Sequence, residues 1–219
     1  MAVNEGTNVT TGIVRMSYVH LFKPYAHSQD QDPKFSVTIL IPKSDTVTMG
    51  NITRGIEAAK QRGANDKWNG VIPPVVTDPV ADGDGMRQDG TPFGPECRGH
   101  YIITARSSAD RPPEVVDTQL QPIINQAEIY SGIYGRVNVD FFPYFNSGKK
   151  GIGCALNSVQ KLRDGEALGG SAPTAAEAFG TPVAAPPTYS NYRPQMTTYR
   201  ATTGAVDPIT GMPMENGQY

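Results

Sequence analysis

The fold of this chain is decided by residues 12–45, GIVRMSYVHLFKPYAHSQDQDPKFSVTILIPKSD, which contain two β-type runs joined by a polar loop. In the second run, polar side chains alternate with an apolar set made of Phe35, Val37, Ile39 and Ile41. This period of two, rich in β-branched residues, is typical of a half-buried strand. In the first run, residues 13–22, the even-numbered side chains from Val14 to Phe22 share one predicted face. The stretch therefore predicts a β-hairpin.

A helix is expected directly after the hairpin. Ser44 or Asp45 can cap its N-terminus, and Gly63 is its expected C-terminal stop. Its apolar residues recur at the spacing of one helical stripe, namely Met49, Ile52, Ile56 and Ala59. Residues 65–95 show no clear periodicity, which predicts a long irregular insertion with Trp68 as a local anchor.

Three more strands are expected, at residues 98–107, 129–145 and 151–162. Gly132 and Gly135 suit a bend of the kind that lets a small barrel turn a corner. A turn joins the last two strands, and we place Lys149 and Lys150 in it. The whole pattern predicts a mainly β fold, an OB-fold-like barrel with one helix, although composition alone does not separate a barrel from a sandwich.

The chain is expected to have three parts. Residues 1–11 read as a flexible lead, residues 12–168 as the OB-fold-like domain, and residues 169–219 as a disordered tail. The tail is crowded with Ala, Pro, Thr and Gly and is poor in large aliphatic side chains. Such a segment cannot bury enough apolar surface to offset the entropy of ordering.

Composition sets few limits on function. The net charge of −2 does not announce a nucleic-acid-binding protein, but a local basic groove can exist on an acidic chain. The N-terminal residues lack the basic and apolar regions of a secretory signal, and no run is long enough for a membrane helix. Two cysteines do not make a disulfide framework, so we expect a cytosolic protein with reduced thiols.

Catalytic and metal signatures are weak. The sequence contains no G-x-S-x-G, P-loop or H-E-x-x-H motif. Asp78, Asp82 and Asp84 lack the spacing and closing glutamate of a calcium loop. Cys97 and His100 form one short-spaced pair, which is too few ligands for a zinc site. We therefore predict no enzyme, no cofactor and no metal.

Aromatic and cationic residues alternate on the polar faces of the expected strands. A protein that holds single-stranded nucleic acid of any sequence needs this mixture, because rings stack on bases and cations follow the phosphates. The predicted DNA-binding residues are Arg15, Tyr18, Lys23, Tyr25, Lys34, Arg98, Tyr101, Arg106, Tyr134, Arg136, Tyr144, Lys149 and Lys150. The alternative is that such rings simply pack against the sheet, and Phe22 and Phe142 are interpreted in that way.

Three stretches resemble the single-stranded-DNA-binding proteins of tailed bacteriophages, a family built on an OB-fold. They are GIVRMSYVHLFKP at 12–24, KFSVTILIPKSD at 34–45 and GIGCALNSVQKLRDGE at 151–166. The resemblance implies a protein that coats and protects single-stranded DNA, whatever its sequence, in phage DNA replication, recombination and repair. It also implies no catalysis, and we expect a homo-oligomer in the cytoplasm of the infected bacterial host.

The tail departs from this family, whose members usually end in a strongly acidic segment that docks replication partners. Here the tail carries Arg193 and Arg200, while Asp207 and Glu215 are its only acids after Glu177. Contact of this tail with DNA, with neighbouring protomers or with replication proteins is a hypothesis.

Two other functions stay open from the sequence. One is an annealing protein that also grips duplex DNA, since a basic groove does not by itself select single strands. The other is a phage structural protein of the virion, which would also be β-rich and loosely tailed.

Overall fold

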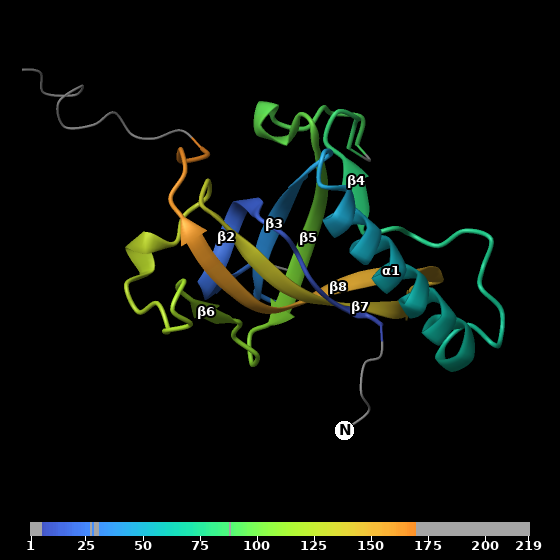
Figure 1. The fold of residues 1–219 in the computed structure, drawn as a ribbon. Coiled ribbons are helices and arrows are strands. Elements are labelled where there is room, and N and C mark those ends of the chain that lie inside the picture. The colour runs from blue at the N-terminus through green and yellow to red at the C-terminus, as the bar shows by residue number, and fades with distance from the viewer. Residues whose placement is uncertain (1–5, 27, 29–30, 88, 170–219) are drawn as a thin grey trace, which may run out of the picture. The chain divides into compact units, whose positions relative to one another are not determined.

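Five strands of the computed structural model form a closed ring (Figure 1). The structure describes residues 6–26, 28, 31–87 and 89–169. Around the ring the order is β2 (Val14–Tyr25), β3 (Lys34–Pro42), β5 (His100–Ser108), β8 (Lys149–Arg163) and β7 (Tyr134–Asn146), which pairs with β2 again. All neighbours in the ring are antiparallel except β5 and β8, which are parallel. The predicted OB-fold-like barrel is confirmed.

Three short strands and two 3₁₀ turns extend the ring. They are β1 (Asn8–Thr10), β4 (Val80–Asp82), β6 (Glu114–Val116), η1 (Pro95–Cys97) and η2 (Gln126–Glu128). β1 pairs with β7, so the flexible lead predicted for residues 1–11 is wrong for residues 8–10. β4 pairs with β5 and β6 pairs with β8. Neither strand was predicted, because three residues are too few for a periodic signal.

The barrel core confirms the alternation predicted for two strands. Val37 and Ile39 of β3 face Val137, Val139 and Phe141 of β7 within one buried cluster. In β2 the predicted alternation is wrong after Ser17. Tyr18 takes a positive φ of 47°, and the register with β3 shifts between Ser17 and His20. This bulge places Leu21 in the core with Val14 and Met16, whereas the predicted alternation put Leu21 on the opposite face.

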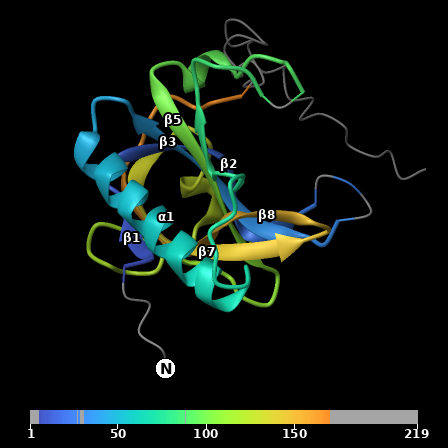
Figure 2. The ribbon, with the colours of Figure 1, turned by 90° about the vertical axis from the view of Figure 1, so that its right-hand side faces the viewer.

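The helix α1 (Thr46–Asp66) lies beside β1 and β7, as Figure 2 shows. Asp45 caps it as predicted, since its carboxylate accepts a hydrogen bond from the Thr48 backbone N–H at 3.0 Å. Gly63 is not the predicted stop but a buried helical residue. A Cβ there would lie 2.7 Å from Cζ3 of Trp68 and 2.8 Å from Cβ of Pro143. The glycine therefore lets the helix approach the barrel closely.

The segment after α1 is anchored by Trp68, as predicted. Its indole is buried, and its N–H donates a hydrogen bond to the Tyr144 carbonyl at 3.3 Å. Farther on, the Thr77 N–H donates to the Lys150 carbonyl at 3.0 Å, so the segment runs beside the start of β8. The insertion expected at 65–95 is therefore shorter and more regular than predicted, because α1 continues to Asp66 and β4 lies within it.

The ends of the last two strands also differ from expectation. β7 begins at Tyr134, after η2 and a turn that includes Gly132 at a φ of 121°. β8 begins at Lys149, so Lys149 and Lys150 are strand residues paired with the end of β7 and do not form the turn. Ser147 and Gly148, which both have positive φ, make that turn.

The predicted tail, residues 169–219, lies outside the described residues except for Gly169, and its disorder stays a prediction. Within the described part of the chain, no helix has the length and hydrophobicity that crossing a membrane requires.

Candidate nucleic-acid interface

A groove of about 680 Å³ opens between strands that are far apart in the sequence. Its lining residues come from the start of β3, the end of β5, and facing parts of β7 and β8: Lys34, Thr104, Arg106, Ser107, Ser108, Arg111, Asp140, Phe142, Tyr144, Asn146, Gly153, Cys154, Ala155 and Leu156. β3 and β5 are the second and third strands of the ring. In OB-folds this pair of strands and the two neighbouring hairpin loops bind oligonucleotides.

Three cations and one acid line this groove. Lys34 opens β3, Arg106 lies near the end of β5, and Arg111 follows that strand. The acid is Asp140 of β7. The pKa of the nearby Cys154 thiol is raised to about 12, mainly by burial; the charge of Asp140 contributes to this rise and that of Arg106 opposes it. Asp140 and Arg106 therefore both act on the buried Cys154 thiol in the groove wall. With three cations and one acid, the net charge of the side chains that line the groove is positive.

Two rings also line the groove. Tyr144 was predicted to bind DNA, and the structure places it beside the cations. Phe142 was interpreted as a packing residue, but 37% of its surface is exposed. The sequence held a signal for Phe142: it shares the alternating face of Asp140 and Tyr144. Arg111, which lies just past β5, also lines the groove although it was not among the predicted DNA-binding residues.

The β2–β3 and β7–β8 hairpins, next to the groove residues Lys34 and Asn146, carry more of the predicted residues. On the β2–β3 hairpin, Tyr25 stacks on His20 with ring centroids 4.5 Å apart and an angle of 9° between the planes. Tyr25 is the register partner of Lys34, and Lys23 is exposed nearby. Burial lowers the pKa of His20, which favours the neutral ring.

At the tip of the β7–β8 hairpin, the Lys150 ammonium lies 5.7 Å from the centroid of the exposed Phe145 ring. Lys149 is exposed beside it. Lys149 is the register partner of Asn146, which lines the groove.

A second group of predicted residues is engaged elsewhere on the barrel. The Tyr134 ring has the Arg163 guanidinium 3.7 Å and the Arg15 guanidinium 5.7 Å from its centroid. Arg15 also donates from Nη2 to the Glu166 carbonyl at 2.8 Å. These contacts hold the end of β8 against β2, and none of the three side chains lines the groove.

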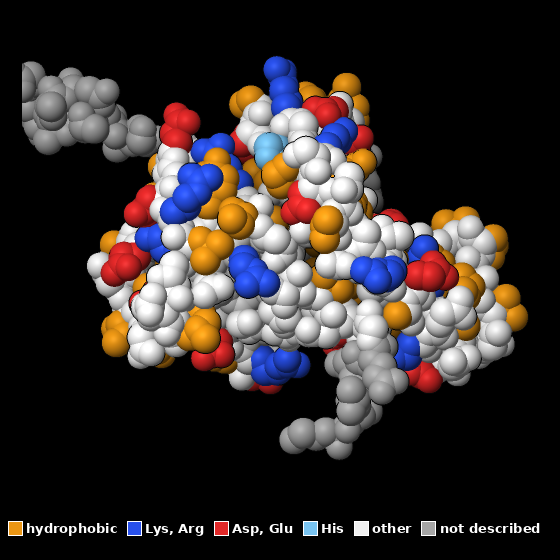
Figure 3. Space-filling model, in the orientation of Figure 1, with side chains coloured by type: hydrophobic (Ala, Val, Ile, Leu, Met, Phe, Trp, Pro, Cys, Tyr) orange, Lys and Arg blue, Asp and Glu red, His pale blue; other side chains and the backbone are white. Residues whose placement is uncertain are grey.

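The remaining predicted residues also lie away from the groove. Tyr101 is at the start of β5, where Lys43 lies 5.4 Å from its ring, and Arg98 follows η1 just before this strand. Arg136 donates from Nε to the Thr11 carbonyl at 3.3 Å. Tyr18 is exposed on the β2 bulge. The face of the molecule shown in Figure 3 carries several separate groups of Lys and Arg side chains and not one continuous basic patch.

The acidic loop that was weighed as a calcium site is occupied by a lysine. The Lys43 ammonium lies 2.6 Å from Asp82 and 2.8 Å from Asp84. Its hydrogen bonds lower the pKa of both carboxyl groups. Over the described ranges, no group of three or more His, Cys, Asp or Glu residues could hold a metal ion.

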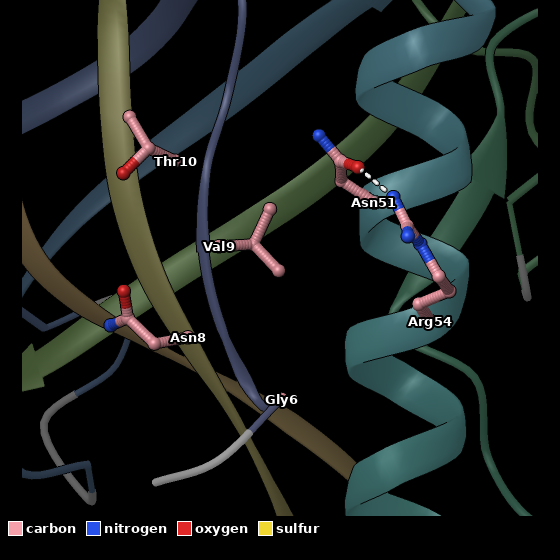
Figure 4. A pocket seen from close by; sticks show the side chains of 6 residues that line it. All are labelled: Gly6, Asn8, Val9, Thr10, Asn51 and Arg54. Carbon is pink, nitrogen blue, oxygen red and sulfur yellow. Dashed lines mark hydrogen bonds between the residues drawn. The ribbon is translucent and has the colours of Figure 1, made fainter.

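A smaller pocket of about 290 Å³ lies between β1 and α1 (Figure 4). It is lined by Gly6, Asn8, Val9, Thr10, Asn51 and Arg54, and Arg54 donates a hydrogen bond to Asn51 within the same helix. With one cation and no ring among these residues, it lacks the combination that single-stranded nucleic acid requires.

Comparisons with known proteins identify the family of this chain. Residues 7–187 match the model of a family described as "Enterobacter phage Enc34, ssDNA-binding protein". The chain belongs to this family. It is also 30% identical over 172 residues to "Putative protein p50" of Acyrthosiphon pisum secondary endosymbiont phage 1, covering 76% of this chain and 89% of that protein. The resemblance inferred from the sequence is thereby confirmed.

Solved structures support the same assignment. The single-stranded DNA-binding protein of bacteriophage Enc34, in complex with ssDNA, is 30% identical to this chain with a TM-score of 0.63. The match covers 75% of this chain and 91% of the Enc34 protein. The single-stranded DNA-binding protein gp2.5 of bacteriophage T7 is 17% identical, with a TM-score of 0.52 and coverage of 75% and 90%, and shows the shared fold alone.

Proposed function

We propose that this protein binds single-stranded DNA without regard to sequence and protects it during phage DNA replication, recombination and repair. The observation that carries the proposal is the groove, which Lys34, Arg106 and Arg111 line together with Tyr144 at the binding position of an OB-fold. Membership of a family of phage ssDNA-binding proteins supports it. A member with 30% identity has been solved with ssDNA.

The chemistry of the groove fits a polyanion with exposed bases. Cations release bound counterions when they neutralise phosphates, and this release drives binding. A ring such as Tyr144 offers a stacking face that every base can use. We infer that the strand crosses the groove between the two hairpins, where Lys23 and Tyr25 meet it at one end and Lys149 and Lys150 at the other.

The other predicted residues lie outside the groove, and we propose structural roles for some of them. The contacts of Arg15 and Tyr134 with Arg163, and of Tyr101 with Lys43, favour structural roles for these side chains. Arg98, Arg136 and Tyr18 lie outside the groove lining, and each stays a prediction as a DNA contact.

A fluorescence titration tests the proposed function. Oligo-dT of increasing length is added to the full chain at two salt concentrations, and we expect saturable binding whose affinity falls as salt rises. Duplex DNA of equal length separates single-strand binding from annealing or duplex binding. A gel shift tests the virion alternative, because a structural protein should not retard single-stranded DNA. Absence of binding to oligo-dT at low salt would overturn the proposal.

The proposal describes a binding protein without catalysis, since the members of its family are ssDNA-binding proteins. It also includes a homo-oligomer and contacts of the tail with replication proteins. Sedimentation of the full chain and of a chain ending near residue 168, each with and without oligo-dT, tests the homo-oligomer. The same two chains, each mixed with replication proteins, test the contacts of the tail.

A further inference from the structure

Each of the two rings in the groove lies opposite a glycine on the neighbouring strand. In the ladder between β7 and β8, Phe142 is paired with Gly153 and Tyr144 with Gly151. Both pairs therefore combine an aromatic side chain with a residue that has no side chain. Aromatic rings can cover such glycines on a neighbouring strand.

The distances show how the rings lie on these glycines. A Cβ added at Gly153 would lie 2.4 Å from Cζ of Phe142 and 2.7 and 2.8 Å from its two Cε atoms. An atom in the ring plane beyond Cζ would be much farther from Cε than from Cζ, so this Cβ position lies above the ring face. A Cβ at Gly151 would similarly lie 2.5, 2.6 and 2.8 Å from Oη, Cζ and Cε1 of Tyr144.

Each ring therefore rests with one face on the backbone of β8. The groove side of Phe142 remains open, because 37% of this apolar residue is exposed and it lines the groove. A ring held flat by its own sheet has already lost its rotamer freedom before a ligand arrives, which lowers the cost of binding. Phe142 and Tyr144 are thus preorganised platforms for flat, apolar groups.

The spacing of the platforms defines what they can hold. Residues two apart on one strand are separated by about 6.8 Å. This is about twice the 3.4 Å rise per nucleotide of a stacked strand. Two neighbouring bases can occupy the two rings only if the strand is extended and its bases are unstacked. The stacked, paired bases of a duplex cannot reach them.

We propose that Phe142 and Tyr144 hold two consecutive bases of an unstacked strand, and that Gly153 and Gly151 are positioning residues that keep the rings flat. This inference rests on the proposed function, because it names the contacts made within the same groove. It assigns selectivity for single strands to the rings, while the cations supply attraction that any nucleic acid would feel.

The rings are tested by Phe142→Ala and Phe142→Tyr in the full chain. Loss of the ring should weaken binding of oligo-dT by roughly 5- to 150-fold, the range for removing one base–aromatic stack. Phe142→Tyr keeps a ring and should bind within about twofold of the unchanged chain. Binding of a duplex of equal length should change far less than binding of oligo-dT in the alanine variant.

The glycine is tested by Gly153→Ala, whose added methyl must displace the ring. We expect it to weaken oligo-dT binding about as much as Phe142→Ala does. The double variant should be no weaker than Phe142→Ala alone, because the glycine acts only through the ring. Gly50→Ala is the matched control, because nothing lies within 4 Å of a Cβ added at Gly50. The affinity of this variant for oligo-dT should equal that of the unchanged chain.

The outcomes separate the two proposals. If the unchanged chain does not bind oligo-dT, the proposed function is overturned. If it binds and Phe142→Ala binds equally well, the platform inference alone is overturned. Full affinity of Gly153→Ala would overturn the positioning role. If Gly153→Ala does not fold, the double variant with Phe142→Ala is measured instead, because its added methyl group has no ring to displace. An oligo-dT affinity of the double variant below that of Phe142→Ala would refute the positioning role.

Discussion

Arg106 offers a sharp test of how the groove attracts DNA. Its guanidinium lines the groove beside Lys34 and Arg111, and its strand pairs with β3 on one side and with β8 on the other. For a single strand, each neutralised phosphate contributes about −0.7 to the slope of log K against log salt. Arg106→Gln removes one cation and keeps a polar, uncharged side chain. The slope should therefore become shallower by about 0.7.

The slope of about −0.7 per phosphate also determines how much the affinity for oligo-dT changes with salt. Raising salt from about 50 to 200 mM weakens each phosphate contact by about 2.6-fold. The advantage of the unchanged chain over Arg106→Gln should therefore shrink by about this factor across that range. The assay is a fluorescence titration with oligo-dT at four or more salt concentrations.

A matched control separates local contact from net charge. Arg54→Gln makes the same change on α1, beside the smaller pocket and outside the groove lining. We expect its slope to equal that of the unchanged chain. An unaltered slope for Arg106→Gln, or an equal change for Arg54→Gln, would refute the assignment of the groove cations.

Further predictions concern stability. Because the pKa of Cys154 is raised to about 12, the folded state favours the neutral thiol. The resulting stability is present below the ordinary thiol pKa and is lost as pH rises from about 9 toward 12, by about 1.4 kcal/mol per unit. Urea unfolding at several pH values should show this loss, and Cys154→Ala should lack it. Gly63→Ala should be about 1–3 kcal/mol less stable than Gly50→Ala, because only the former overpacks the helix against Trp68 while both gain helix propensity. Equal stabilities by urea unfolding would contradict this packing. Asp45→Ala should cost about 0.5–2 kcal/mol through the lost cap, and unchanged thermal and urea midpoints would count against that role.

Much of the local structure could be predicted because it depends on neighbours in the sequence. The alternation in β3 and the middle of β7 identified the buried faces, and Asp45 identified the start of α1. The pattern in β2 failed at Tyr18, because a bulge adds a residue to one strand and reverses the faces that follow. Gly63 was misread because its role depends on Trp68 and Pro143, which contact it only in the folded chain.

The sequence predicted which types of residue form the candidate site, but not which of those residues lie together in it. Alternating rings and cations mark several strand faces, yet the faces that meet in the groove are those near Lys34, Arg106 and Tyr144. Tyr101 lies on the same strand as Arg106 but near its other end, where Lys43 contacts it.

The sequence by itself determined the strand-forming segments, the capped helix, the mixture of rings and cations, and the resemblance to the phage family. Only the tertiary structure decided which of those side chains share one groove, and it added Phe142 lying flat on Gly153. The physical reason is that barrel closure pairs strands distant in the sequence. The period of a strand reports which face a side chain takes, but the register between strands decides what it meets there.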